Sequence, residues 1–455
     1  MRLRLVLPRS RGRAGLRSLR RASPLAAFAL LAVLAQLAAL SLAGCGGSRA
    51  SKTTGVSYAP TLPAPAPRGP AFGLTEDNAD LLWSPGASPS SASASAFEAA
   101  RQRLTALHPR YVRLLVDWAA LQPEADRAPS LQGPVDGCAR SVGPCAPYAG
   151  LREELAAIAS QQRAAAAEGR PGYEVVLDVF GTPAWAARPA SGCELGATLA
   201  FSRPINAAGV AGYRALVRSL LALGASSGVA LRWWSPWNEP NDPVFLSPQR
   251  PACTPAAPSL APAVYAQLAQ AMAGELSAEG GVHHLLLGEL NAFATDSPHR
   301  TSVAAFVAAL PASVVCLSDT WSIHAYASRT RASSGPDPVA MLAAALDARG
   351  ACGARASIWI TEAGAGARHP GRPRPPGAED AHAGCLALAA QLDRWAADPR
   401  VRAVLQYSFR EDPAFPVGLL SADLAHVYPA YRLWLRYARA SAQGRPVPAQ
   451  AALCA

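Results

Sequence analysis

The sequence predicts an α/β protein that folds as a (β/α)8 TIM barrel, a closed ring of parallel strands surrounded by helices. Two observations lead to this fold class. From about residue 70 onward, eight short β-branched and aromatic runs alternate with eight alanine- and leucine-rich helical stretches. No glycine-rich phosphate loop follows the first of these runs, which disfavours the competing open, doubly wound sheet.

The first 45 residues have the architecture of an export signal. Residues 1–22 are rich in arginine, and residues 24–43 are almost wholly apolar. The run closes on Leu-Ala-Gly-Cys at 42–45, which resembles a bacterial lipobox, so Cys45 is the expected lipid-anchor residue and mature N-terminus. An uncleaved transmembrane anchor is the alternative, because about 20 apolar residues can span a bilayer. Both alternatives put the remaining chain outside the cytoplasm, as a membrane-anchored lipoprotein or a secreted protein.

A linker and one large domain are expected after this segment. Residues 46–70 are rich in Ser, Thr, Ala and Pro and are expected to form a linker without a core of its own, ahead of a barrel domain at residues 71–455. The formal charge of +11 is misleading, because eight arginines and no acid precede Cys45, which leaves a charge of +3 for the rest. A domain so close to neutral is not expected to bind nucleic acid.

Eight cysteines follow Cys45, and an even number in an exported chain predicts disulfide bonds. No two of them have the CxxC spacing of a zinc site, so no metal site is expected. Sequence alone permits many pairings. We hypothesise four bridges, the first of them local and the second between residues that each precede a predicted strand: Cys138–Cys145, Cys316–Cys352, Cys193–Cys253 and Cys385–Cys454.

The expected strands are short apolar runs, and the expected helices are the amphipathic stretches between them. The strands cover residues 71–75, 111–118, 173–180, 230–237, 284–290, 320–326, 357–361 and 403–409. The helices cover residues 96–107, 149–168, 207–223, 261–278, 301–310, 338–348, 380–397 and 428–440. Four tryptophans have apolar neighbours and are expected in the core: Trp118, Trp233, Trp234 and Trp359.

Two of the expected strands end on a glutamate. The run at 231–241, Leu-Arg-Trp-Trp-Ser-Pro-Trp-Asn-Glu-Pro-Asn, is apolar up to Glu239, where a proline on each side prevents regular pairing with a neighbouring strand. The run at 357–364, Ser-Ile-Trp-Ile-Thr-Glu-Ala-Gly, ends in the same way on Glu362. All strands of a parallel barrel end at one face, and active sites lie there. Glu239 on strand four and Glu362 on strand seven are therefore expected to meet.

These two runs resemble the acid/base and nucleophile signatures of clan A glycoside hydrolases. The similarity extends over nearly the whole domain. Arg113 resembles the clan's strand-two arginine, and the run Gly-Thr-Pro-Ala-Trp-Ala at 181–186 resembles its strand-three end. His324 and Tyr326 match its strand-six His-x-Tyr, and residues 407–419 are similar to families thirty-nine and five.

One departure from the family pattern concerns the last strand. The tryptophan that usually closes strand eight as a sugar platform is absent, and Tyr407 and Phe409 lie nearby instead. Subsite specificity is expected in the loops 123–148, 188–204 and 241–258, which carry four of the eight cysteines and could form stapled lids over the cleft.

The resemblance implies a retaining hydrolase of carbohydrates that needs no metal or cofactor, with Glu239 as acid/base and Glu362 as nucleophile about 5–5.5 Å apart. Arg113 and Tyr326 are expected beside Glu362 as donors to an ionised nucleophile, and an aromatic surround is expected to keep Glu239 protonated. Asn238 is expected to donate to the sugar 2-OH. The candidate walls of the sugar site are Trp185, Trp237 and His324.

Alternative interpretations remain open at three of these positions. Arg113 could form an ion pair with Asp117, His324 could be a satisfied core histidine, and Glu289 at the end of strand five could contact substrate or be solvated. For the whole chain, the preferred hypothesis is an exported retaining glycoside hydrolase that cleaves β-linked glycosides or polysaccharide. The alternative is a non-catalytic carbohydrate-binding or envelope-interaction lipoprotein on the same barrel. Two paired glutamates favour the enzyme, because a binding protein has no need of an acid and a nucleophile held together.

Overall fold

The computed structural model describes residues 69–76, 91–131, 135–139, 142–148, 150–196, 198–327, 336–365, 379–443 and 451–454. All of them belong to a unit that spans Tyr58 to Ala455. The expected export signal with Cys45, and the expected linker except for residues 69 and 70, lie outside the described residues. Within the described ranges, no helix has both the length and the apolar character needed to cross a bilayer.

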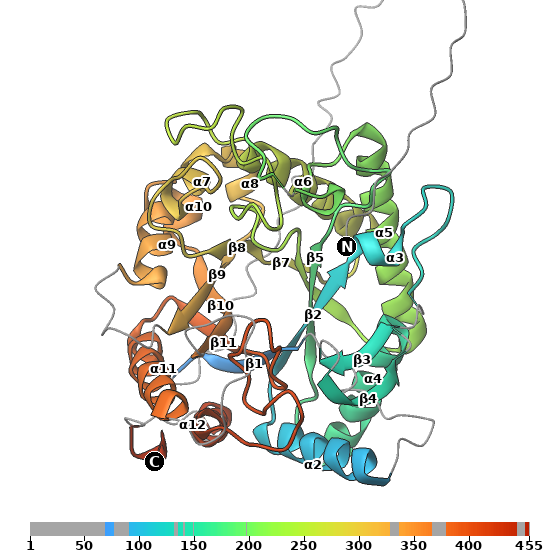
Figure 1. The fold of residues 1–455 in the computed structure, drawn as a ribbon, viewed down its shortest axis with the longest axis vertical. Helices are drawn as coiled ribbons and strands as arrows, with labels where there is room; N and C mark the ends of the chain where they lie inside the picture. Colours follow the sequence, from blue (N-terminus) through green and yellow to red (C-terminus); the bar gives the residue numbers. More distant parts are fainter. Residues whose placement is uncertain are drawn as a thin grey trace, which may run out of the picture. The chain divides into compact units, whose positions relative to one another are not determined.

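Parallel strands form the centre of this unit. The sheet has nine strand segments in the order β7-β6-β5-β2-β1-β11-β10-β9-β8. β7 and β8 are two parts of the fifth strand, separated by Leu286 alone; β7 pairs with β6 and β8 pairs with β9. The sheet thus closes into a ring, which confirms the expected barrel (Figure 1). The segments are β1 (Ala71–Glu76), β2 (Tyr111–Asp117), β5 (Glu174–Phe180), β6 (Leu231–Ser235), β7 (His284–Leu285), β8 (Leu287–Asn291), β9 (Thr320–Ala327), β10 (Ser357–Ala365) and β11 (Val401–Tyr407).

Helices follow each barrel strand and lie outside the ring (Figure 1). Their ends carry ordinary capping signals: the Asn206 side chain accepts from Gly209 N at the start of α5, and Gly228 ends that helix with a positive φ of 69°. The longer helices match the expected stretches, and the short helices α3, α8 and α10 are additional. The helices are α2 (Ser91–Leu107), α3 (Trp118–Leu121), α4 (Leu151–Ala167), α5 (Ala207–Ser227), α6 (Ala261–Glu279), α7 (Val303–Ala309), α8 (Ala312–Val315), α9 (Pro338–Asp347), α10 (Ala351–Ala354), α11 (Glu379–Ala397), α12 (Pro429–Ala442) and the 3₁₀ turns η3 (Ala200–Ser202) and η4 (Ala451–Cys454).

The inside of the ring is apolar at the N-terminal ends of the strands. The ring centroids of Tyr111 and Trp359 are 4.4 Å apart, and those of Trp233 and Trp359 are also 4.4 Å apart. Together with small and aliphatic side chains, these rings close this end of the barrel. We call this group the aromatic floor; it comprises Ala71, Tyr111, Val176, Trp233, Leu286, Trp359, Ala403 and Leu405. Trp118 and Trp234 are buried in the core outside the ring, as expected.

Two features at the opposite end were not predicted. The chain after β2 forms a short helix at once, because the Asp117 side chain caps α3 by accepting from Ala120 N at 3.0 Å. The loop that follows contains an antiparallel hairpin of β3 (Val135–Ala139) and β4 (Val142–Tyr148). The buried Arg410, which follows β11, donates to the carbonyl oxygens of two β4 residues, Val142 and Pro144, at 3.0 and 2.8 Å. The hairpin is thereby tied to the loop after the last strand.

Three of the four hypothesised disulfides are present. Cys193–Cys253 joins the loops after β5 and β6, Cys316–Cys352 joins the chain after α8 to α10, and Cys385–Cys454 joins α11 to η4. The first bridge staples two of the loops expected to form lids. The fourth hypothesised pair, Cys138 and Cys145, lies on β3 and β4, but the side chains of these two residues are outside the described part of the structure.

Candidate active site

The expected site residues lie at the C-terminal ends of the barrel strands. Arg113 is on β2, His324 and Tyr326 are on β9, Glu362 is on β10, and Glu239 follows β6 in the loop. Glu362 pairs in register with His324 across neighbouring strands, and the register shifts between residues 360 and 362 of β10. Such a bulge lets two consecutive side chains face the same side of a strand. Glu362 and the residue before it both point toward the charged centre of the barrel for this reason.

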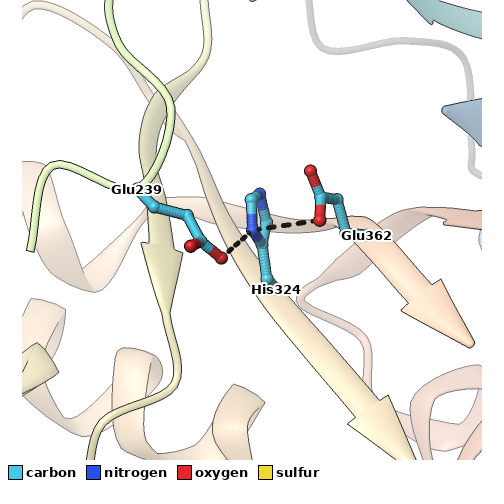
Figure 2. A group of neighbouring side chains, drawn as sticks. All are labelled: Glu239, His324 and Glu362. Atoms are coloured by element: carbon cyan, nitrogen blue, oxygen red, sulfur yellow. Dashed lines mark hydrogen bonds and ion pairs between the residues drawn. The ribbon is translucent and has the colours of Figure 1, made fainter. Parts of the chain in front are cut away.

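The two glutamates lie close together. One oxygen of Glu239, one ring nitrogen of His324 and one oxygen of Glu362 all lie within 4.8 Å of one another. Figure 2 shows His324 between the two carboxylates, with contacts to each. The spacing agrees with the carboxyl separation of about 5–5.5 Å in retaining glycosidases and is shorter than the separation of about 6.5–9.5 Å in inverting ones.

Glu362 accepts hydrogen bonds on both oxygens. Arg113 Nη1 donates to its Oε1 at 2.7 Å, and the Tyr326 hydroxyl donates to its Oε2. Burial and the nearby Glu362 raise the pKa of Tyr326, so this phenol stays protonated and remains a donor. The structure therefore brings together Arg113, Tyr326 and Glu362, the grouping expected from the sequence.

Glu239 is held by its backbone as well as by its side chain. It has a positive φ of 38°, and its N–H donates to the Glu289 carbonyl oxygen at 2.9 Å. The Asn291 amide donates to its Oε2 at 3.3 Å. Burial raises the pKa of the Glu239 carboxyl, against the lowering effect of His324. The side chains that hydrogen bond to the Glu239 carboxyl are Asn291 and His324. The expected aromatic surround stays a prediction.

His324 has both ring nitrogens engaged. Nδ1 lies 2.7 Å from Glu239 Oε1 and 3.4 Å from Glu362 Oε2, and Nε2 lies 2.8 Å from Glu289 Oε2. Burial opposes a charge on the ring, but Glu362, Glu239 and Glu289 outweigh it and raise the pKa of His324 to about 10. The ring is thus an imidazolium between carboxylates. Because it is only 2% exposed, it is not the sugar wall that the sequence suggested.

Arg113 is fully buried and donates hydrogen bonds to several acceptors. Besides Glu362, its Nη2 lies 2.8 Å from Asp178 Oδ2, 2.8 Å from Asn238 Oδ1 and 3.0 Å from Glu289 Oε2. The alternative ion pair with Asp117 is wrong, since that side chain caps α3. The contact also orients Asn238: its oxygen faces Arg113, so the amide nitrogen is the group left to donate to a ligand.

Of the two tryptophans predicted as sugar walls, the structure excludes Trp237 by its burial, while the role of the partly buried Trp185 stays a prediction. Trp237 is completely buried, and its indole N–H donates to the Phe245 carbonyl oxygen at 3.0 Å. Trp185 donates to the Gln122 carbonyl oxygen at 2.9 Å and packs edge-on against Trp118. A ring without an exposed face cannot stack on a sugar, so Trp237 is corrected to a supporting residue of the loop that carries Glu239. The contacts of Trp185 place it against the chain after β2.

Aromatic rings instead gather beside Glu362. The ring centroids of Tyr326 and Phe415 are 4.9 Å apart, and those of Tyr407 and Phe415 are 5.7 Å apart. Phe415 is 37% exposed, whereas Phe409 is completely buried. We call Tyr326, Tyr407 and Phe415 the aromatic rim. The sequence pointed to Tyr407 but missed Phe415, whose only signal was a Phe between Ala and Pro in the loop after the last strand.

Two buried acids complete the site. Glu289 is neither solvated nor exposed to a substrate, which settles the open alternatives of the sequence against both. Asp178 on β5 is equally buried, and burial raises its pKa well above the usual value despite the neighbouring Arg113. Sequence reasoning missed Asp178, although a single Asp within the apolar run of β5 was a signal that could have revealed it.

Glu239, His324 and Glu362 also have the spacing of a metal site. A histidine ligand must be neutral, because it binds a metal through a ring lone pair. Both ring nitrogens of His324 lie within 2.8 Å of carboxylate oxygens, so the three side chains are arranged as a set of ion pairs.

No protein-family model matches the sequence, and no curated protein matches it. Solved structures of glycoside hydrolases are similar in fold. A variant of the GH5_18 protein from Bifidobacterium longum subsp. longum, in complex with Manb1-4GlcNAc, is 15% identical with a TM-score of 0.50, and the match covers 83% of this chain and 80% of that chain. A GH5_18 variant from Streptomyces cattleya, in complex with the same ligand, is 17% identical with a TM-score of 0.48, and the match covers 83% of this chain and 82% of that chain.

A family 30 glycoside hydrolase is similar to the same extent. The catalytic domain of the GH30 xylanase C from Talaromyces cellulolyticus is 12% identical with a TM-score of 0.48, and the match covers 84% of this chain and 78% of that chain. At 15% identity and a TM-score of 0.50, the match with the Bifidobacterium longum protein shows a shared barrel fold and carries no activity or substrate with it. The chain thus shares a barrel fold with this glycoside hydrolase, as the resemblance found in the sequence led us to expect.

Proposed function

We propose that this chain is an exported retaining glycoside hydrolase that cleaves β-linked glycosides or polysaccharide. The observation that carries the proposal is the placement of Glu239 and Glu362 with oxygens within 4.8 Å of each other and, apart from the shared His324, with different partners. Glu362 faces the cation Arg113 and the donor Tyr326, whereas Glu239 is buried with a raised pKa. Two carboxyl groups with such different surroundings can act as nucleophile and acid.

In the first step, Glu362 would attack the anomeric carbon while Glu239 gives its proton to the departing glycosidic oxygen. The bond between that carbon and oxygen breaks as the bond to Glu362 forms. Arg113 and Tyr326 fix the attacking carboxylate in place. The result is a sugar covalently bound to Glu362, a free leaving group and an ionised Glu239.

In the second step, Glu239 would take a proton from water, and the water oxygen would attack the same carbon to release Glu362. The His324 imidazolium at 2.7 Å stabilises Glu239 in the ionised form that this step requires. Two displacements at one carbon restore its configuration. The protein needs no cofactor for either step.

The polar and aromatic groups around the pair suit a sugar. Asn238 has its oxygen held by Arg113, and its amide nitrogen would donate to the 2-OH of the bound sugar. The aromatic rim would supply the stacking surface that the missing strand-eight tryptophan supplies in related hydrolases, with Phe415 as its most exposed member. The β-linkage rests on the resemblance to clan A.

Export is part of the proposal. The signal-like segment with its lipobox would place a lipid on Cys45, and residues 46–70 would tether the barrel to the outer face of the cell membrane. Three disulfides are consistent with an oxidising compartment.

The test is turnover of a panel of aryl β-glycosides by the full-length protein, with NMR detection of the anomer that is released first. Wild-type protein is expected to release the β-anomer, and Glu362→Gln is expected to lose about 10⁴-fold in turnover. Glu174→Gln serves as a matched control, because this glutamate lies at the N-terminal end of β5 beside Arg110. It should keep full activity.

Three outcomes would count against the proposal. First release of the α-anomer would exclude retention, and undiminished turnover by Glu362→Gln would exclude its role. Failure to cleave any aryl glycoside or polysaccharide, together with measurable carbohydrate binding, would favour the alternative of a non-catalytic carbohydrate-binding lipoprotein.

A further inference from the structure

Glu289 is a buried acid for which the proposed mechanism has no direct use. It lies on β8, has no exposed surface and has a positive φ of 51°. A non-glycine residue in that region of backbone space costs on the order of 1–3 kcal/mol and persists where the surroundings enforce it. A carboxylate kept in such a place must have partners that compensate for its burial.

The contacts of Glu289 reach both sides of the catalytic pair. Its Oε2 lies 2.8 Å from His324 Nε2, accepts from Arg113 Nη2 at 3.0 Å and accepts from Thr361 Oγ1 at 2.6 Å. Its backbone carbonyl accepts from Glu239 N at 2.9 Å. The Glu289 carboxylate is therefore linked to Glu362 through Arg113 and to Glu239 through His324, and the Glu289 backbone contacts Glu239 directly.

The charges around Glu289 balance only when it is ionised. Arg113 and His324 are cations, while Glu362 and Glu289 would be the matching anions if Glu239 carries its proton. Asp178 also contacts Arg113, but its burial favours the neutral acid. Without the charge on Glu289, the two buried cations would share one anion.

We propose that Glu289 is a positioning residue whose carboxylate holds His324 in the charged form between Glu239 and Glu362, and whose backbone carbonyl fixes Glu239. The proposal deepens the glycosidase function and rests on it. Glu289 touches neither substrate nor the reacting atoms; it acts through His324 and Arg113. The acidity of these groups agrees with the geometry: Arg113 and His324 overcome the effect of burial and lower the pKa of Glu289 to about 2.

The groups that face Glu289 and His324 come from several strands. His324 faces Glu239 from the loop after β6, Glu289 from β8 and Glu362 from β10, while Asp178 and Asp242 act on it from further away. Glu289 also faces Arg113 from β2, Thr361 from β10 and the buried Tyr265 from α6. Arg113 is the one further cation in this set, and it does not titrate in the working range.

A histidine-specific NMR titration of the full-length protein tests the proposal without any substrate. The ¹⁵N signals of His324 are assigned by their loss in His324→Gln. In wild-type protein at pH 8, both ring nitrogens are expected to be protonated. A neutral ring at this pH would overturn the proposal, whether or not the Glu289 variants fold.

Two substitutions separate charge from shape. Glu289→Gln keeps the side-chain length and removes the charge, so the titration midpoint of His324 should fall by about one pH unit or more. Glu289→Asp shortens the side chain and keeps the charge, so the midpoint should stay closer to that of the wild type. A lower His324 midpoint in Glu289→Asp than in Glu289→Gln would overturn the proposal. Equal midpoints in the wild type and both variants would overturn it as well.

Kinetics supply an independent readout once a substrate is known. Glu289→Gln is expected to lower kcat about tenfold or more with KM changed less than about threefold, and its activity should decline with rising pH through the new His324 midpoint. Glu275→Gln is the matched control, because this glutamate on α6 also contacts two cations, Arg214 and Arg218. It should change neither kcat nor the His324 titration; an equal loss of kcat in Glu289→Gln and Glu275→Gln would overturn the proposal.

If no substrate is ever cleaved, the glycosidase function fails, while the NMR titration still tests the role of Glu289.

Discussion

The two ends of the barrel interior differ sharply although the same strands build them. At the N-terminal end, Tyr111 on β2 and Trp359 on β10 pack ring against ring in the aromatic floor. One pleat further along β2, Arg113 faces the same side of the strand and reaches Glu362 on β10 at 2.7 Å. Apolar contacts fill one end, and ion pairs fill the other.

Because of this difference, the two ends of the barrel interior contribute to different properties of the protein. Burying aromatic surface stabilises the fold by an amount that grows with the area removed from water. Burying ion pairs contributes little net stability, because desolvation cancels much of the attraction. The floor therefore closes and stabilises the barrel, while the charged end holds groups ready to exchange protons. Substitutions at the two ends should affect different measured quantities.

The largest expected effect is on catalysis, from Glu239→Ala at the charged end. Removing the acid should lower turnover of substrates with poor leaving groups by about 10²–10⁴-fold, and much less for an activated aryl leaving group that departs without a proton. The melting temperature should change less than turnover does, because the carboxyl that is lost is protonated and Glu362 and Glu289 remain to balance Arg113 and His324. Steady-state kinetics on a series of leaving groups measures the loss of turnover, and a thermal melt measures the melting temperature. An equal loss for all leaving groups would contradict the acid role.

The next effect is on stability, from Trp359→Ala in the aromatic floor. The cavity left by a buried Trp should lower the free energy of unfolding by about 3–5 kcal/mol. Turnover per folded molecule should change less than about tenfold, since no charged contact is removed. Urea unfolding and kinetics at a permissive temperature measure the two, and Trp359→Phe should show a smaller loss of stability. A catalytic loss as large as that of Glu239→Ala would break the division between the two ends.

Stability should also depend on pH through the charged end. The pKa of His324 is raised from 6.5 to about 10 in the folded protein. Its contribution to stability is therefore fully present below about pH 6.5 and is lost as the pH rises toward 10. The difference in free energy of unfolding between wild type and His324→Gln should shrink over this window by on the order of a few kcal/mol. The corresponding difference for Trp359→Phe should stay constant; if it changes equally, His324 is not the source.

The smallest effect is expected at the aromatic rim, from Phe415→Ala. An exposed ring that stacks on a sugar contributes about 1 kcal/mol, so KM should rise about fivefold with kcat nearly unchanged. The melting temperature should not change, because Phe415 is already 37% exposed. An unchanged KM would show that the ring does not contact the substrate. Phe415→Tyr, which keeps the stacking surface, is the matched control.

The sequence predicted the barrel well because its signal is periodic and local. Eight apolar runs became barrel strands, with boundaries displaced by a few residues. Of the expected core tryptophans, Trp118, Trp234 and Trp359 are buried, and Trp233 is partly buried against the aromatic floor. The hairpin of β3 and β4 was missed because its sequence, with Pro144 and Gly137 within the strands, lacks the alternation that indicates a strand. The break of the fifth strand at Leu286 was also invisible, since the apolar run continues through it.

The site was predicted in part for a similar reason. Strand ends could be located, so Glu239, Glu362, Arg113 and Tyr326 were placed correctly near one another. Contacts across strands depend on register, and register shifts at bulges, such as that of β10 before Glu362, leave no mark in the sequence. Partners within the interior, such as Asp178 and Glu289, follow from that register. Their roles emerged only from the folded structure.

The three disulfides have one further consequence, which concerns how the chain matures. Among the described residues, each bridge joins a cysteine to the next bonded cysteine along the chain: 193 with 253, 316 with 352, and 385 with 454. The covalent loops are consecutive and never interleave. If the chain is exported as proposed and is oxidised from its amino end, these three bonds can form one after another in the order in which their thiols emerge. Slow reshuffling of mispaired bonds is not required on such a route.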